Sequence, residues 1–204
     1  MSGLIVYVDG FNLYHGMKDK FGRRLLWLDL VALATSLRPK SNLLGVKYFT
    51  APVLDNPDAA SRQGRYQRAL LAGAGGRLEI IQGRYQKKTI TCRKCRASWT
   101  HYEEKETDVN IATAMVFDAA EGKADSLIVI SADSDLVPAV RSARALNPRL
   151  FIAAGFPPGR YSAELKKLMP ASFHIGTTKL TQSQLPNLVT DSTGQTYQRP
   201  AKWR

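Results

Sequence analysis

The sequence predicts an α/β protein with a mainly parallel sheet. Two observations carry this prediction: short runs rich in Ile, Val and Leu recur along the chain, and segments with helical periodicity separate them. A short apolar run bounded by polar residues is typical of a strand buried on both faces, as in a parallel sheet covered by helices. With 204 residues, 44% of them hydrophobic, the chain can bury such a core within one domain.

The expected elements alternate along the chain. Strands are predicted at residues 4–8, 46–50, 78–81, 127–131 and 150–153, with an edge strand at 173–175. Helices are predicted to begin at Asp29, Pro57 and Thr107, because Asp and Thr cap helices and Pro suits a first turn. Two more are expected over 136–146 and through 165–168. Residues 180–204 are polar and aperiodic, which predicts an extended or partly disordered tail after a domain at 1–179.

The charge balance points to a polyanionic partner. The chain has 29 Lys and Arg against 17 Asp and Glu, a net charge of +12, and nucleic acid is the first candidate. No apolar stretch is long enough to span a membrane, and no charged-then-apolar leader precedes the first strand, so no membrane partner is expected. The two cysteines lie three positions apart and suit a reduced compartment, which predicts a cytoplasmic protein.

Acidic residues follow two of the predicted strands. Asp9 closes the first, Asp133 and Asp135 follow the fourth, and Asp108 is expected in the first turn of a helix. In open α/β sheets the carboxyl ends of strands form the ligand cleft. Carboxylates gathered there would repel one another unless a cation neutralised them, and oxygen ligands favour Mg²⁺ or Mn²⁺. The sequence therefore predicts a divalent-metal site.

Residues 84–102 form a basic, irregular insertion in this prediction. Trp99 lies among its cations and could stack on the bases of single-stranded nucleic acid, or it could belong to a small aromatic cluster that stabilises the insertion. The candidate nucleic-acid contacts are Arg84, Lys87, Lys88, Arg93, Lys94, Arg96 and Trp99.

Three segments carry a resemblance to a known family. Residues 6–13 (VYVDGFNL), 103–112 (EEKETDVNIA) and 130–136 (ISADSDL) resemble the signature blocks of the NYN domain, a branch of the PIN-like nuclease superfamily. Residues 156–160 and 183–186 further resemble a bacterial LabA-like group. The resemblance implies a three-layer α/β/α sandwich with a PIN-like, Rossmann-like sheet, and metal-dependent cleavage of RNA.

The resemblance also assigns roles to individual residues. Asp9, Asp108 and Asp133 match the positions that hold metal in the family, Asp135 supplies a fourth acid, and Asn12 matches its polar partner. The predicted function is a metal-dependent ribonuclease, with an endonuclease favoured, that hydrolyses the phosphodiester with metal-activated water. One alternative is an RNA-binding or regulatory module with little or no cleavage, and another is a phosphodiesterase for small nucleotides.

Cys92 and Cys95 have the spacing of half a zinc site. His101 is near enough in sequence to add a ligand, and a second copy of the chain could complete the site, which would predict a homodimer. The alternative is two thiols at the tip of a hairpin. The sequence leaves both interpretations open.

Other polar residues have less specific expectations. Asp118 and Asp125 lack a partner motif and are expected at the surface or in helix caps. His15 is expected in a solvated loop after the first motif. Ser131 could either donate a hydrogen bond to the site or close a turn.

Overall fold

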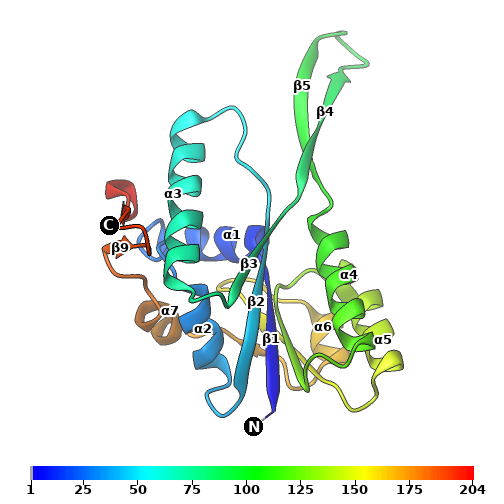
Figure 1. Cartoon of the computed structure of the whole chain (residues 1–204). Coiled ribbons are helices and arrows are strands. Elements are labelled where there is room, and N and C mark those ends of the chain that lie inside the picture. The colour runs from blue at the N-terminus through cyan, green and yellow to red at the C-terminus, as the bar shows by residue number, and fades with distance from the viewer. Residues whose placement is uncertain (1) are drawn as a thin grey trace.

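A six-stranded parallel sheet forms the centre of the molecule. The computed structural model describes residues 2–204, apart from the side chain of His101. The strand order is β3-β2-β1-β6-β7-β8, and every pair is parallel. The strands are β1 (Gly3–Asp9), β2 (Asn42–Thr50), β3 (Leu78–Gln82), β6 (Ser126–Ile130), β7 (Phe151–Phe156) and β8 (Phe173–His174), drawn in Figure 1. The predicted α/β class and parallel sheet are confirmed.

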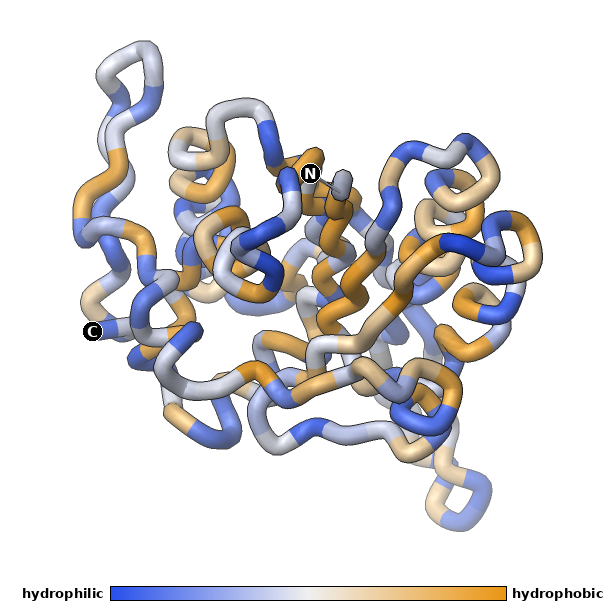
Figure 2. Tube along the Cα trace, turned by 90° about the horizontal axis from the view of Figure 1, so that it is seen from below, coloured by the Kyte–Doolittle hydropathy of each residue, from blue (hydrophilic) through white to orange (hydrophobic). Residues whose placement is uncertain are grey.

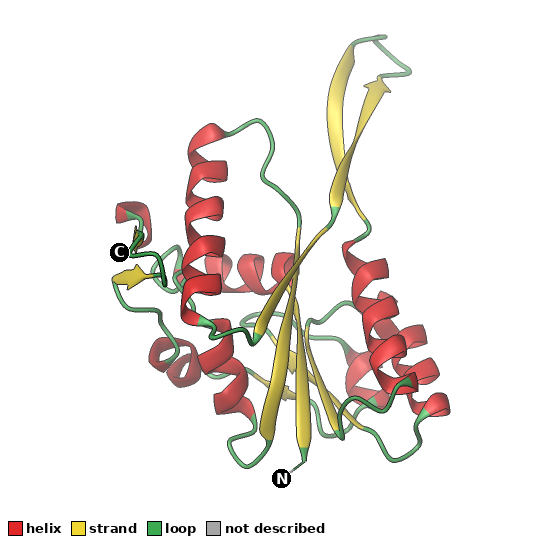
Figure 3. Ribbon diagram, in the orientation of Figure 1, coloured by secondary structure: helices red, strands yellow, loops and turns green. Residues whose placement is uncertain are grey.

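Helices cover both faces of this sheet (Figure 3). On β1, Leu4 and Val6 belong to one core while Ile5 and Tyr7 belong to the other, because successive strand residues point to opposite faces. Figure 2 shows hydrophobic segments running through the middle of the molecule. The helices are α1 (Gly10–Phe21), α2 (Leu30–Leu37), α3 (Pro57–Gly73) and α7 (Thr177–Gln182) on the first core, and α4 (Thr107–Ala120), α5 (Val137–Leu146) and α6 (Ala163–Leu168) on the second. The predicted three-layer sandwich is confirmed.

The first helix is absent from the sequence prediction. Gly10, Asn12 and Gly16 lower its helix propensity, but the Asp9 side chain caps it, and His15 therefore lies on a helix rather than in a loop. Gly10 has a steric role as well, because a Cβ there would lie 2.6 Å from the carbonyl oxygen of Phe49. Glycine thus allows α1 to begin directly against β2.

All three predicted helix starts are confirmed, since α2 begins directly after Asp29, α3 at Pro57 and α4 at Thr107. The Asp29 carboxylate accepts hydrogen bonds from the second and third backbone amides of α2, and Pro57 lies in the first turn of α3. The predicted capping by Thr107 is wrong: Glu106 precedes α4 at φ +80° without a capping side chain, and the Glu104 carboxylate accepts the Thr107 backbone amide at 3.1 Å. None of the described helices is long and apolar enough to cross a membrane.

The insertion predicted as irregular at 84–102 is a regular antiparallel hairpin. Strands β4 (Arg84–Thr91) and β5 (Ser98–Lys105) pair from base to tip and project away from the body of the molecule (Figure 1). Both strands are rich in polar and charged residues, so they lack the apolar pattern of a buried strand. Cross-strand pairing in a two-stranded ribbon needs no such pattern.

The C-terminal segment is folded, in place of the predicted extended tail. After α7 it forms the hairpin of β9 (Leu188–Thr190) and β10 (Thr196–Gln198) and ends in the short 3₁₀ helix η2 (Ala201–Trp203). Leu185, Val189 and Trp203 are buried in the first core. These apolar residues are too widely spaced in sequence to show a helix or strand periodicity, yet all three are buried in the core.

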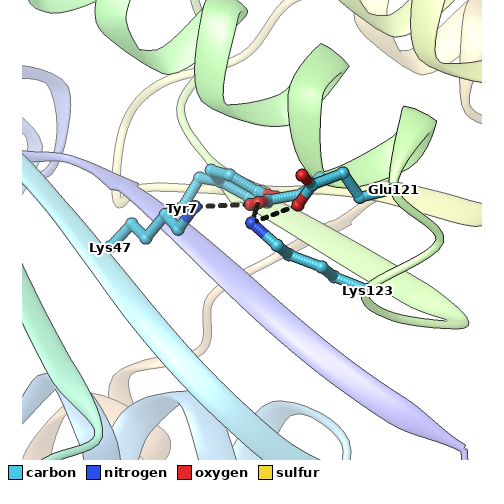
Figure 4. A network of polar contacts seen from close by, with 5 residues as sticks. Tyr7, Lys47, Glu121 and Lys123 are labelled. Carbon is cyan, nitrogen blue, oxygen red and sulfur yellow. Dashed lines mark hydrogen bonds and ion pairs between the residues drawn. The ribbon is translucent and has the colours of Figure 1, made fainter.

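Asp118 is buried rather than at the surface. Its carboxylate accepts hydrogen bonds from the Tyr7 hydroxyl at 2.6 Å, from Lys47 Nζ at 2.6 Å and from Lys123 Nζ at 3.2 Å. Figure 4 shows this network, in which Lys123 also reaches Glu121. Burial raises the pKa of Asp118, but the bonds from Lys47, Tyr7 and Lys123 outweigh it and lower the pKa overall. The network joins α4 to β1 and β2.

Candidate active site

The candidate site lies where the order of the sheet reverses. Strands β2 and β3 extend from one side of β1, and β6, β7 and β8 extend from the other. Val8 on β1 pairs with Ile130 on β6, so the residues that follow these two strands meet at the same edge. This is the place where open α/β sheets bind ligands.

Asp9 is the most enclosed of the four predicted metal-binding acids. It is 3% exposed, and its Oδ1 accepts the Asn12 backbone amide at 2.9 Å while its Oδ2 accepts the Ser131 hydroxyl at 2.7 Å. Burial raises the pKa of Asp9, the bonds from Asn12 and Ser131 oppose that rise, and the charge of Asp133 adds to it. Asp9 therefore caps α1 and also contributes charge to the site.

Ser131 connects the two strand ends. Its hydroxyl donates to Asp9, and its oxygen accepts the Asp133 backbone amide at 3.0 Å. Ser131 is fully buried, so this link is shielded from water. The sequence left Ser131 undecided between a contact with the site and a turn. In the structure it makes both bonds and sets the position of Asp133 relative to Asp9.

Asn12 ties α1 to the loop after β6. Its side-chain oxygen accepts the Ala132 backbone amide at 3.2 Å. Within the described residues its side-chain NH₂ group has no hydrogen-bond acceptor. That group can donate to a phosphate oxygen without adding charge.

The pKa of Asp108 is raised well above the ordinary value of an aspartate. Burial and, in decreasing order, the charges of Asp133, Asp9, Glu104 and Asp135 raise its pKa to about 6. Asp108 lies in the first turn of α4, half-buried. No Lys or Arg of the described chain forms an ion pair with Asp9, Asp108, Asp133 or Asp135. The acids are thus close enough to repel one another without compensation.

Asp133 and Asp135 belong to the short helix after β6. Asp133 caps η1 (Ser134–Leu136), and its Oδ1 accepts the Asp135 backbone amide at 2.9 Å. Asp133 is half-buried and Asp135 is exposed. The structure therefore places Asp133 nearer to the enclosed part of the site.

The donor set fits a hard divalent cation, although the side chains are not arranged as a finished metal site. Across residues 2–204, leaving aside the His101 side chain, no three His, Cys, Asp or Glu residues converge on one ion. The oxygen-only donors and the uncompensated charge suit Mg²⁺ or Mn²⁺. The assignment of Asp9, Asp108, Asp133 and Asp135 as ligands stays a prediction.

The predicted nucleic-acid residues lie on the β4–β5 hairpin. Arg84 pairs with Glu106 and Lys88 with Glu103, so two of the predicted cations are already partnered by acids. The remaining cations, Lys87, Arg93, Lys94 and Arg96, form no ion pair with a described carboxylate. Trp99 is half-exposed and lies opposite Ile90 in the register. The hairpin thus presents an apolar pair beside free positive charge.

Cys92 and Cys95 are free thiols at the hairpin tip. The backbone amides of Cys95 and Lys94 donate to the Cys92 sulfur and lower the pKa of its thiol. A lowered pKa favours the thiolate, the form that binds metal. The side chain of His101 lies outside the described residues, so the predicted contribution of His101 to a zinc site stays a prediction.

Comparison with known proteins places this geometry in a family. The NYN domain family profile matches residues 3–174. The chain belongs to the NYN domain family. Its sheet and flanking helices correspond to the PIN-like α/β/α fold.

The chain is also similar to a curated protein and to a solved structure. The chain is 28% identical to 6-hydroxy-3-succinoylpyridine 3-monooxygenase HspA from Pseudomonas putida, over 90% of this chain and 70% of that protein. A crystal structure of a protein of unknown function from Vibrio parahaemolyticus superposes with a TM-score of 0.57 at 17% identity, covering 86% of this chain and 94% of the other. This second similarity supports the fold alone.

Proposed function

We propose that this NYN domain protein is a metal-dependent ribonuclease, with an endonuclease favoured, that acts on single-stranded RNA in the cytoplasm. The observation that carries the proposal is the group of uncompensated carboxylates at the reversal point of the sheet, where Asp108 has a pKa of about 6. The net charge of +12 supports a polyanionic substrate. Residues 156–160 and 183–186 support membership of the LabA-like group.

Each side chain of the site would have a separate role in hydrolysis. Asp9, Asp108 and Asp133 would hold a divalent cation, with Asp135 as a more exposed fourth acid. When bound, such an ion lowers the pKa of water and stabilises the charge that develops on phosphate. Ser131 would keep Asp9 and Asp133 at a fixed spacing through its two hydrogen bonds. The unused NH₂ group of Asn12 would donate to a phosphate oxygen.

Positive charge on the hairpin would guide the substrate to these acids. The unpaired cations, Lys87 on β4 and Arg93, Lys94 and Arg96 at the tip, can contact the phosphate backbone, and the half-exposed Trp99 can stack on a base. Contacts of this kind are tolerant of sequence and suit unpaired strands. The hairpin would therefore bind the RNA, and the acids at the edge of the sheet would hydrolyse it.

The test is cleavage of matched single-stranded RNA and DNA with Mn²⁺, Mg²⁺ or EDTA. We expect the wild type to cut RNA in a metal-dependent way and Asp133→Asn to lose cleavage while keeping its fold. Asp58→Asn is the matched control, because Asp58 is also an acid near a helix start but lies exposed on α3. Full cleavage by Asp133→Asn would refute the assignment.

Two measurements added to this experiment, RNA binding and dinucleotide cleavage at varied salt, distinguish the alternatives. Tight RNA binding without cutting in any metal would indicate an RNA-binding or regulatory module. Cleavage of dinucleotides with little dependence on salt would indicate a phosphodiesterase for small nucleotides, because a short substrate makes few phosphate contacts.

A second candidate function is oxygenation of an aromatic acid. The similarity to a monooxygenase over 90% of this chain favours it. Incubation with 6-hydroxy-3-succinoylpyridine, dioxygen and a reductant such as NADH would test it. Substrate-dependent oxidation of NADH with a hydroxylated product would support this function, and an unchanged substrate would count against it.

A further inference from the structure

A cavity lies near the carboxylates, since Gly10, the residue after Asp9, lines it. Its volume is about 370 Å³, and its walls come from α1, the loop between α1 and α2, the start of α2, the end of β2, α3, β4 and η2. Pockets of this size accommodate small ligands. Six aromatic side chains line it: Phe11, Tyr14, Tyr48, Tyr66, Tyr85 and Trp203.

The floor of the cavity is held in place by packing and hydrogen bonds. The ring of Tyr66 lies edge-to-face against Trp203, with centroids 5.7 Å apart, and its hydroxyl donates to the Leu28 carbonyl at 2.7 Å. Gln63 fixes the wall after β2 by donating to the Ala51 carbonyl and accepting the Val53 amide, both at 2.8 Å. The rings are therefore positioned before any ligand arrives.

The cavity is positively charged. Four cations line it, Lys18, Arg23, Arg62 and Lys202, whereas none of its lining residues is Asp or Glu. None of these four forms an ion pair with a carboxylate in the described chain. Lys18 Nζ lies 5.6 Å from the centre of the Tyr14 ring. The unpaired charge over aromatic walls favours a ligand that is both flat and anionic.

We propose that this cavity binds a planar aromatic ring that carries an anionic group. The ring would lie against Tyr48 and Trp203, and the anion would contact Arg62, whose guanidinium can bind phosphate or carboxylate with two parallel hydrogen bonds. Two sources share this chemistry: a nucleotide, with its base and phosphate, and a free aromatic carboxylic acid. The neutral polar groups of the wall, including Asn56, can contact further atoms of either ligand.

The cavity adjoins the carboxylate site through the start of α1. Gly10 lines the cavity and directly follows Asp9, and a Cβ at Gly10 would lie 2.7 Å from a ring carbon of Tyr48. A ligand held against Tyr48 would therefore lie next to the end of β1. The proposal does not depend on nuclease activity, since ring binding is measurable without metal.

Calorimetric titration in EDTA tests the proposal with four probes. Adenosine 5′-monophosphate and nicotinate each combine a ring with an anion, adenosine has a ring without the anion, and ribose 5-phosphate has the anion without a ring. We expect at least one of the first two to bind with Kd below about 1 mM, and the incomplete probes to bind about tenfold more weakly. Binding of the nucleotide alone or of nicotinate alone identifies the source, and both results support the shared chemistry.

Two variants and a matched control locate the site. Arg62→Gln should weaken binding about tenfold by removing the charge that contacts the anion. Arg65→Gln is the control, because Arg65 lies on the same helix without lining this cavity. Ala59→Trp should abolish binding by filling the space, with circular dichroism confirming the fold. Asp133→Asn should bind as the wild type does, which separates this proposal from the ribonuclease proposal.

Three results would overturn the proposal. The first is no binding of either ring-anion probe at millimolar concentration. The second is ribose 5-phosphate binding as tightly as the nucleotide, which would show that the ring contributes nothing. The third is an equal effect of Arg62→Gln and Arg65→Gln, which would place the ligand elsewhere.

Discussion

Replacing Asp108 with Asn should stabilise the protein while removing its proposed activity. Asp108 carries a charge that burial and four neighbouring carboxylates disfavour, so its pKa rises from 3.8 to about 6. Asn has nearly the same shape and no charge. The variant would therefore lose a proposed metal ligand and relieve repulsion in the metal-free protein.

The gain in stability expected for Asp108→Asn follows from the pKa shift of Asp108. A rise from 3.8 to about 6 corresponds to about 3 kcal/mol at neutral pH for a fully enclosed group. Asp108 is only half-buried, so solvent screening roughly halves this figure. The dipole at the start of α4 favours the carboxylate by about 0.5 kcal/mol, which the variant loses. The net gain is about 1 kcal/mol, or an increase in Tm of about 2–4 °C.

The sign of the pH dependence follows from the same shift. Because the folded-state pKa of Asp108 is raised, the cost of ionising it is absent below about pH 3.8, grows as pH rises and is complete above about pH 6. The stability difference between Asp108→Asn and the wild type should therefore be full at pH 7.5 and vanish near pH 4. Mg²⁺ should stabilise the wild type more than the variant, because it binds the folded site.

Thermal unfolding in EDTA at pH 7.5 and pH 4, followed by circular dichroism, measures these differences. Asp58→Asn serves as the control, since Asp58 lies in the first turn of α3, exposed. We expect its Tm to stay the same or fall slightly. A fall in Tm for Asp108→Asn at pH 7.5, or the same difference at both pH values, would refute the interpretation of repelling carboxylates.

Three further predictions concern other parts of the molecule. Asp118→Ala should lower the free energy of unfolding in urea by about 3 kcal/mol, because it leaves Tyr7 and Lys47 without their buried partner. Lys94→Gln should reduce the salt dependence of RNA binding by about one unit in the log–log slope, and Lys88→Gln by less, because Lys88 already pairs with Glu103. If Cys92 and Cys95 form half of a zinc site, protein purified without chelator should contain about one zinc ion per two chains, and Cys92→Ser should lose both the zinc and the dimer.

Each of these predictions has a contrary outcome. Asp125→Ala, at an exposed carboxylate that accepts the Gly3 amide, should destabilise the protein less than Asp118→Ala does, and equal losses would contradict the importance of the buried network. Equal salt slopes for Lys88→Gln and Lys94→Gln would mean that ion pairing on the hairpin does not matter for RNA. Zinc absent at every stoichiometry would favour the alternative interpretation, two free thiols at the hairpin tip.

Much of the candidate site could be predicted from sequence because it depends on strand ends. Short apolar runs mark the strands, and an acid that directly follows such a run must lie at the carboxyl end of that strand. This rule predicts the position of Asp9 and, two residues further along its loop, that of Asp133, while Asp108 is predicted from its position near a helix start. The sequence does not decide the role of Ser131, because a serine after a strand can close a turn as easily as it can bridge two acids.

Local sequence patterns do not predict features that depend on contacts between distant segments. Helix α1 has two glycines, and its stability comes from the Asp9 cap and from packing against β2, which a propensity scale does not include. Asp118 was expected at the surface, since nothing near it in sequence shows that Lys47 and Tyr7 will reach it. The positions of Leu185 and Trp203 in the core likewise depend on segments more than a hundred residues away.

Short-range patterns of hydrophobicity and charge are enough to predict the α/β class, the buried strands and the acids at their ends. The strand order that brings β1 beside β6 exists only in the folded chain, and so do the burial and the mutual repulsion that raise the pKa of Asp108. The aromatic cavity also forms only on folding, because its walls come from residues as far apart in sequence as Gly10 and Trp203. Proximity between distant segments depends on how the whole core is packed, and no local pattern encodes it.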